Sequence, residues 1–245
     1  MTEITLIGWL SAGVAAGIVG FSKSGLKGIG VIIVTIMALV FGSRASTGIL
    51  LPLLIVGDVL AVIYYRRHVQ IGLLFKLLPW MMLGVVIGAV IGKDLPEQIF
   101  KQGMAVIILF SVGMMYLWDK KKNKTIPSNW WFAGIMGLLA GITTMIGNLA
   151  GAFANVFFLA MRLPKNQFIG TTAWLFFIVN LFKMPFHIWS WETITTETLM
   201  IDVKLALCTI VGFFLGVRVI AMIQNDFYRK MILILTAIGA LLIFL

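Results

Sequence analysis

Charged residues are scarce in this sequence: they make up 11% of its 245 residues, while 61% are apolar and the mean hydropathy is +1.06. Soluble domains carry about 25% charged residues. Because so few polar side chains cannot cover a chain of this length in water, the sequence predicts an integral membrane protein. The net charge of +10 does not indicate nucleic acid as a partner, since the basic residues cluster in short loops between apolar runs.

Cysteine and histidine are almost missing, with one cysteine, Cys208, and two histidines, His68 and His187. One cysteine excludes an internal disulfide and metal sites built from several cysteines. The sequence also lacks HExxH, GxSxG and Walker motifs, and it has no paired carboxylates on one helix face. We therefore expect no enzyme activity, no cofactor and no resident metal. Without an ATP-binding motif, any transport by this chain alone would use a gradient.

Long apolar runs dominate what is present, and charged residues, glycines and prolines divide them into segments. These segments cover roughly 4–20, 29–42, 46–65, 72–92, 98–117, 130–147, 149–161, 167–188, 203–222 and 228–245. As helices, 29–42 and 149–161 would be about 20 Å long, too short for about 30 Å of hydrocarbon. Each follows a glycine-rich break. The predicted fold class is an all-α membrane protein with about five helical segments in each half and short or broken helices near the start of each half.

The two halves of the chain resemble each other. The tripeptide at 16–18, Ala-Gly-Ile, recurs at 140–142, an offset of 124 residues, and Thr47-Gly48 corresponds to Ile169-Gly170 at an offset of 122. At the second offset Asp58 lies opposite Asn180. Each half has an odd number of segments, so the second would be inverted relative to the first. We predict a first inverted repeat at 1–118, a cytoplasmic linker at 119–129 and a second inverted repeat at 130–245.

The loop charges predict the topology. Most basic loop residues fall on the side of the linker, and most acidic residues, including Asp202 in a predicted outer loop, fall on the opposite side. The positive-inside rule then places the linker in the cytoplasm and both termini outside. We expect the membrane to be a bacterial inner membrane. The positive-inside rule does not decide the form of the two segments on either side of each break, 4–20 with 29–42 and 130–147 with 149–161. Each such short pair could be a re-entrant hairpin or a broken span. The oligomeric state also stays open, with a homodimer as one option.

The first break, from Gly20 to Gly30, carries two lysines, Lys23 and Lys27, between apolar runs. A lysine at the bilayer centre costs about 2.5–3.5 kcal/mol, so a functional role is the first hypothesis. Serine hydroxyls, peptide N–H groups freed by glycines and the positive end of the following helix would all favour an anion. The alternative is that the lysines extend to an interface and the glycines allow tight helix packing.

The second break, 145–151, is uncharged, and Asn148 is its strongest hydrogen-bonding side chain. We expect the two breaks to meet near the membrane midplane. Within the long segments, Asp58 is a coupling candidate: it would either pair with Lys23 in the empty state or carry a proton, and a purely structural salt bridge is the alternative. The candidate substrate-binding residues are Ser22, Lys23, Ser24, Gly25, Lys27, Asn148, Gly151, Thr172, Trp174, Asn180 and Lys183. Thr143, Thr144 and Asn155 are weaker candidates.

Over nearly its whole length the chain resembles the TauE/SafE family of sulfite and organosulfonate permeases. The likeness is carried by the run at 20–30, by 46–58 and 64–68, and by 147–151 and 170–185. Family members typically have Gly-Ile-Gly-Gly-Gly at the first break, where this chain has Ser-Lys-Ser-Gly. The resemblance implies a secondary transporter that exports sulfite, sulfoacetate or related organosulfonates, coupled to protons or running down a gradient.

The resulting prediction is a permease that works by alternating access at a midplane site, with a small anion and membrane lipid as its partners. One alternative is a permease or channel for another small solute, such as a metal cation, which would require buried acids to outnumber buried lysines. Another is a membrane-embedded enzyme or assembly factor, which would require a nucleophile, a metal set or a large exposed domain.

Overall fold

The computed structural model describes residues 4–26, 28–100, 102–103, 106, 130–161 and 163–224, and in these the chain is all helical. The α-helices are α1 (Leu6–Lys23), α2 (Gly30–Phe41), α3 (Ser43–Tyr65), α4 (Ile71–Lys93), α6 (Trp130–Gly147), α7 (Gly151–Ala160), α8 (Lys165–Pro185) and α9 (Thr196–Ala221). A 3₁₀ turn, Arg66–His68, follows α3, and a π-helical turn, Phe186–Ser190, follows α8. The predicted linker, the predicted segment 228–245 and most of 98–117 lie outside the described residues.

Six of these helices are long and apolar enough to cross a membrane. The chain is therefore a multi-pass membrane protein, as its composition predicts. The two segments predicted to be short are confirmed as short: α2 has 12 residues and α7 has 10. At 1.5 Å per residue they extend about 18 and 15 Å, far less than the hydrocarbon thickness.

Each short helix folds back along the helix before it. Val40, near the end of α2, lies beside Gly8, near the start of α1. In the second half, the rings of Phe132 in α6 and Phe157 in α7 have centroids 5.9 Å apart, so the end of α7 returns beside the start of α6. Both short pairs are thus antiparallel helical hairpins. Because α1 and α6 are themselves long enough to cross a membrane, this packing fits both alternatives left open by the sequence, the re-entrant hairpin and the broken span.

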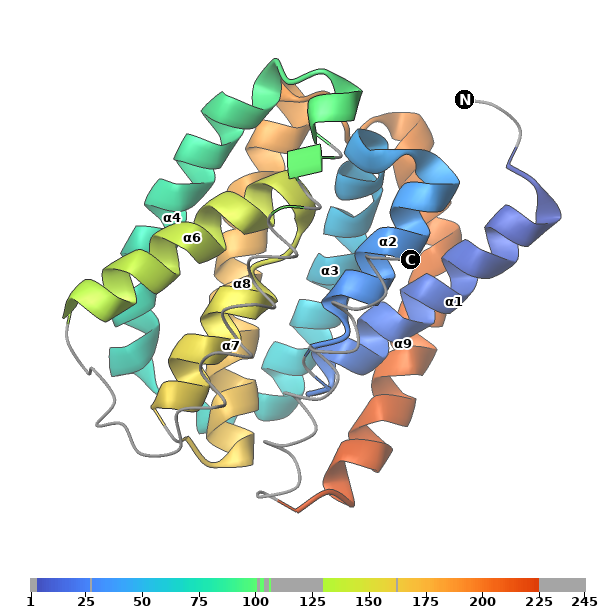
Figure 1. Ribbon diagram of the computed structural model, residues 1–245. Coiled ribbons are helices and arrows are strands. Elements are labelled where there is room, and N and C mark those ends of the chain that lie inside the picture. The colour runs from blue at the N-terminus through green and yellow to red at the C-terminus, as the bar shows by residue number, and fades with distance from the viewer. Residues whose placement is uncertain are drawn as a thin grey trace.

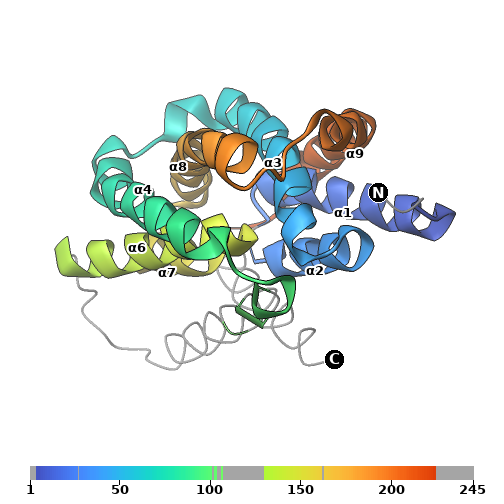
Figure 2. The same ribbon diagram turned by 90° about the horizontal axis from the view of Figure 1, so that it is seen from above.

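Close glycine contacts hold each hairpin against a long helix of the other half. Gly20 of α1 lies against the backbone of Thr209 in α9, and Gly141 of α6 lies against the backbone of Met81 in α4. A larger side chain at either glycine would collide with backbone atoms. Small residues permit such close approach, which stabilises helix pairs in a membrane. Figures 1 and 2 show α4 with α6 on one side of the molecule and α1 with α9 on the other.

Helices α3 and α8 lie between these two groups and run in opposite directions. Gly170, near the start of α8, lies against Tyr65 and His68 at the end of α3. About two-thirds of the way along α3 and three-quarters of the way along α8, the Asn180 side-chain N–H donates to Asp58. These residues occupy equivalent positions in the predicted repeat, and such residues meet where a two-fold axis passes between them. This contact supports the inverted repeat, which stays a prediction.

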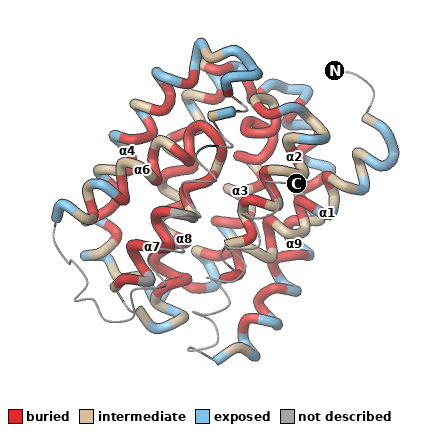
Figure 3. The backbone as a smooth tube through the Cα atoms, in the orientation of Figure 1, coloured by how far each residue is buried: buried red, intermediate tan, exposed pale blue. Residues whose placement is uncertain are grey.

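Burial follows the helix faces (Figure 3). The inner faces are buried, whereas large apolar side chains such as Leu6, Leu39, Trp131 and Val203 are exposed on the outside. An apolar outer surface is expected where lipid replaces water as the solvent.

One predicted boundary is wrong: α9 begins at Thr196, not at 203. The side chains and backbone N–H groups of Thr195 and Thr198 bond to each other reciprocally and cap the helix start. The acid predicted for an outer loop, Asp202, therefore lies within α9, where it is buried.

Candidate functional site

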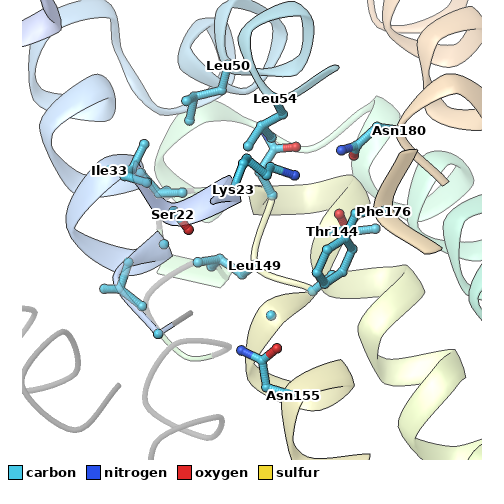
Figure 4. Close-up of a pocket in the computed structure, with 17 residues that line it drawn as sticks. Ser22, Lys23, Ile33, Leu50, Leu54, Thr144, Leu149, Asn155, Phe176 and Asn180 are labelled. Atoms are coloured by element: carbon cyan, nitrogen blue, oxygen red, sulfur yellow. The ribbon is translucent and has the colours of Figure 1, made fainter. Parts of the chain in front are cut away.

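A cavity of about 100 Å³ lies between the two helix breaks. The first break contributes Gly28, and the second contributes Leu149 and Ala150. Figure 4 shows Ser22 and Lys23 on one side of the cavity and Thr144 on the other. The expectation that the breaks approach each other is confirmed, while their depth in a membrane stays a prediction. A cavity of this volume has room for a small ion.

The two short helices both start at this cavity. Gly30, the first residue of α2, and Gly151, the first residue of α7, line it. The first N–H groups of a helix have no partner within the helix, and the helix dipole places partial positive charge at that end. Two such ends at one cavity create a positive potential without any charged side chain, which favours an anion.

A buried ion pair forms one wall of the site. Lys23, in the last turn of α1, places Nζ 2.6 Å from Oδ1 of Asp58, in the middle of α3. Oδ2 of Asp58 accepts a hydrogen bond of 2.6 Å from Nδ2 of Asn180 in α8. Both carboxylate oxygens are therefore occupied. The predicted pairing of Lys23 with Asp58 is confirmed as a contact; whether Asp58 takes part in coupling stays a prediction.

A second lysine stands behind the cavity wall. Lys183 of α8 is fully buried, and its Nζ donates to Oδ1 of Asn148 at 2.6 Å, to Oγ1 of Thr144 at 3.2 Å and to Oδ1 of Asn180 at 3.4 Å. Among the described residues, no carboxylate forms an ion pair with it. The Asn148 side-chain N–H in turn donates to the Thr47 carbonyl at 3.1 Å. One hydrogen-bonded network thus joins both breaks to α3, α6 and α8.

The charges of this network do not cancel. Its ionisable members are the lysines at 23 and 183 and the carboxylate at 58; with all three ionised, the network carries one net positive charge among the described residues. Lys23 is neutralised by its partner, whereas Lys183 has only neutral oxygens around it. The cation without a counter-ion is therefore Lys183, whereas the sequence centres the predicted anion site on Lys23 in the first break.

The backbone of the two breaks differs from expectation at one point. Helix α1 continues to Lys23, so Ser22 and Lys23 are helical and the chain unwinds only from Ser24 to Ile29. In the second break Asn148 adopts a left-handed conformation, with φ of 57°, which asparagine tolerates better than most residues. That turn directs its side chain to Lys183 and Thr47.

The predicted binding residues fall into three groups. The first lines the cavity and consists of Ser22, Lys23, Asn148, Gly151 and Asn180. Lys183 contacts three cavity-lining residues from behind. Ser24, Gly25, Thr172 and Trp174 lie outside the described lining, and Lys27 lies outside the described residues. Of the weaker candidates, Thr144 and Asn155 line the cavity.

Sequence reasoning missed two features. The Phe176 ring lies under Lys23, with Nζ 5.2 Å from the ring centroid, and it lines the cavity. Its position one turn before Asn180 on the same helix face is the signal that could have found it. Asp202 was assigned to a loop, yet it is buried, and neither of its carboxylate oxygens has a hydrogen-bond partner among the described residues.

Comparison with known proteins gave one match. The family model described as "Sulfite exporter TauE/SafE" matches residues 5–243. Searches of curated proteins and of solved structures each found no match.

Proposed function

Because the chain belongs to the TauE/SafE sulfite exporter family, a family of membrane transporters, we propose that it exports a small sulfur oxyanion through the cavity between its two helix breaks. Sulfite and the smallest organosulfonates are the first candidates for a cavity of about 100 Å³, and sulfoacetate is the larger candidate. The membrane would be a bacterial inner membrane, with both termini outside.

The observation that carries this proposal is the uncompensated positive charge of the network. Burying an unpaired ammonium group is costly, so a site that keeps one gains free energy when an anion arrives. Lys183 meets only side-chain oxygens of Asn148, Thr144 and Asn180. Helix ends at Gly30 and Gly151 add to the same potential.

The oxyanion would take hydrogen bonds from the site in place of its water shell. Ser22 supplies a hydroxyl group, and the starts of α2 and α7 supply peptide N–H groups. Lys23 lies at the cavity edge but is paired with Asp58, and Lys183 lies behind Asn148, so the unpaired positive charge would act on the anion through the cavity wall. Hydrogen bonds from the hydroxyl and N–H groups to a charged acceptor are charge-assisted and about twice as strong as neutral ones.

Alternating access would move the two hairpins relative to the long helices. The hairpins enter from opposite ends of the molecule and meet at the cavity, so opening one side and closing the other would expose the site in turn (Figure 1). The close glycine contacts of α1 with α9 and of α4 with α6 would keep each hairpin attached to a long helix during the movement.

The proposal is tested by the flux of radiolabelled sulfite into or out of proteoliposomes. Wild-type protein should carry sulfite, and Lys183→Gln should abolish the flux. Lys204→Gln is the matched control because Lys204 is an exposed lysine whose Nζ lies over Trp9 on the surface, so this variant also loses one positive charge. Absence of sulfite flux in the wild-type protein, or equal flux in Lys183→Gln, would contradict the proposal.

A cation permease is the second candidate, and the site does not favour it. A cation site in a membrane requires carboxylates or carbonyl oxygens free to bind the ion. Asp58 is the carboxylate in the described network, and Lys23 and Asn180 occupy both of its oxygens. A panel of anions and divalent cations in a thermal-shift assay on purified protein should therefore give stabilisation by anions alone.

A further inference from the structure

We propose that this site selects singly charged oxyanions over doubly charged ones of the same size. The inference rests on the proposed function and refines it, because it states the charge that the carried sulfur anion must have. It follows from how the charges of the network are paired, and it makes Asp58 the residue that sets the selectivity.

The charges of the network can be balanced by one added negative charge. Lys23 and Asp58 are in direct contact at 2.6 Å, so this pair contributes no net charge to the cavity. Lys183 contributes one positive charge, and its contacts are neutral oxygens. A monoanion brings the network to neutrality. A dianion leaves one negative charge in a site where uncompensated charge is costly.

Lys23 cannot easily be released to serve a second negative charge. Detaching its ammonium group would leave Asp58 buried with one hydrogen bond, from Asn180, in place of an ion pair. An anion near Lys23 would also be repelled by Asp58, whose Oδ1 lies 2.6 Å from the lysine Nζ. Asp58 therefore lowers the positive charge available to the substrate and acts against dianions.

Size alone would not make this distinction. Sulfate and methanesulfonate are similar in size, so a cavity of about 100 Å³ offers no steric ground for preferring one of them. Sulfite takes up a proton near neutral pH, so the inference identifies the singly protonated ion as the carried form. Export of one negative charge from a cell with a negative interior is driven by the membrane potential, without a proton carrier in the protein.

The test uses two competitors whose charge is fixed throughout the neutral pH range: methanesulfonate, with one negative charge, and sulfate, with two. Each is added to proteoliposomes that carry radiolabelled sulfite, and the concentration for half-maximal inhibition is measured. Wild-type protein should be inhibited by methanesulfonate at a concentration about tenfold or more below that for sulfate.

Variants then change the charge of the network step by step. Asp58→Asn raises the net charge by one and should move the preference toward sulfate by about tenfold or more. The double variant Lys23→Gln/Asp58→Asn restores the wild-type charge and should restore the preference for methanesulfonate. This pair of variants separates charge from the loss of a particular side chain.

The outcomes are distinct. If wild-type protein shows no sulfite flux, the proposed function fails. If sulfite is carried but sulfate inhibits as well as methanesulfonate, or neither inhibits, the charge selectivity is overturned while anion export stands. The wild-type comparison decides the question even if Asp58→Asn does not fold.

Discussion

The first break, between α1 and α2, and the second, between α6 and α7, occupy equivalent places in the two halves and open on the same cavity. They differ in what they bring to it. The first has a lysine immediately before it, and Asp58 neutralises that lysine. The second has no charge of its own, yet its Asn148 binds Lys183, which has no counter-ion in the described part of the chain.

This difference separates a structural charge from a functional one. In the first half, a cation and an anion stabilise each other where three helices meet. In the second half, a cation is surrounded by the side chains of Asn148, Thr144 and Asn180, which can orient it without neutralising it. Changes to the first pair should therefore affect folding most, and changes around Lys183 should affect transport most.

The largest expected effect is that of Asp58→Ala on stability. Removing the carboxylate leaves the Lys23 ammonium group buried without a counter-ion, which costs about 3–5 kcal/mol. Thermal unfolding of the purified protein in detergent measures this loss. The double variant Lys23→Met/Asp58→Leu removes both charges and should recover most of the stability. If the double variant were as unstable as Asp58→Ala, the loss of stability would not come from the unpaired charge of Lys23.

The next effect is on transport. Lys183→Met should lower sulfite flux per reconstituted protein by about 100-fold, because the loss of the one positive charge without a counter-ion in the described network is worth about 3 kcal/mol. The Lys23→Met/Asp58→Leu double variant should keep its flux within about tenfold of wild type, since the net charge is unchanged. If the double variant lost as much flux as Lys183→Met, the distinction between the two lysines would be wrong.

A third prediction separates the backbone of the second break from its side chain. Asn148→Gly keeps the left-handed turn but removes the bonds to Lys183 and Thr47, so it should fold and lose sulfite flux. Asn148→Ala loses the same bonds and also strains the turn by about 1–2 kcal/mol. Asn148→Ala should therefore unfold at a lower temperature than Asn148→Gly. Equal stability of the two variants would show that the turn does not constrain position 148.

Much of this architecture could be predicted because polar residues in apolar runs are conspicuous. The helix boundaries lie within a few residues of the predicted segments for most elements, and the conspicuous polar residues Asp58, Asn180 and Lys183 do belong to one network. The repeat alignment even paired Asp58 with Asn180, which are in contact.

What could not be predicted depends on distances in space. Which lysine is neutralised is decided by where Asp58 points, and no pattern in the sequence contains that information. Phe176 is an aromatic residue in an aromatic-rich helix, so its place under Lys23 has no distinctive signal apart from its helix face. Asp202 was missed because hydropathy alone started its segment at 203, whereas Thr195, with Glu197 in the first turn, is a recognisable helix start.

The smallest effect is expected at Ser24, which the repeat alignment at an offset of 124 residues places opposite Asn148. The Ser24 hydroxyl donates to the Phe21 carbonyl at 2.7 Å within the same helix turn, and the Ser24 carbonyl accepts from the Tyr65 hydroxyl at 2.8 Å. Ser24→Ala removes only the first bond, which is worth about 0.5–1.5 kcal/mol.

The unfolding temperature of Ser24→Ala should therefore change little, and its sulfite flux should stay at the wild-type level, in contrast to Asn148→Gly. A loss of flux in Ser24→Ala comparable to that of Asn148→Gly would mean that the two breaks contribute alike, and that the asymmetry between them is confined to their charges.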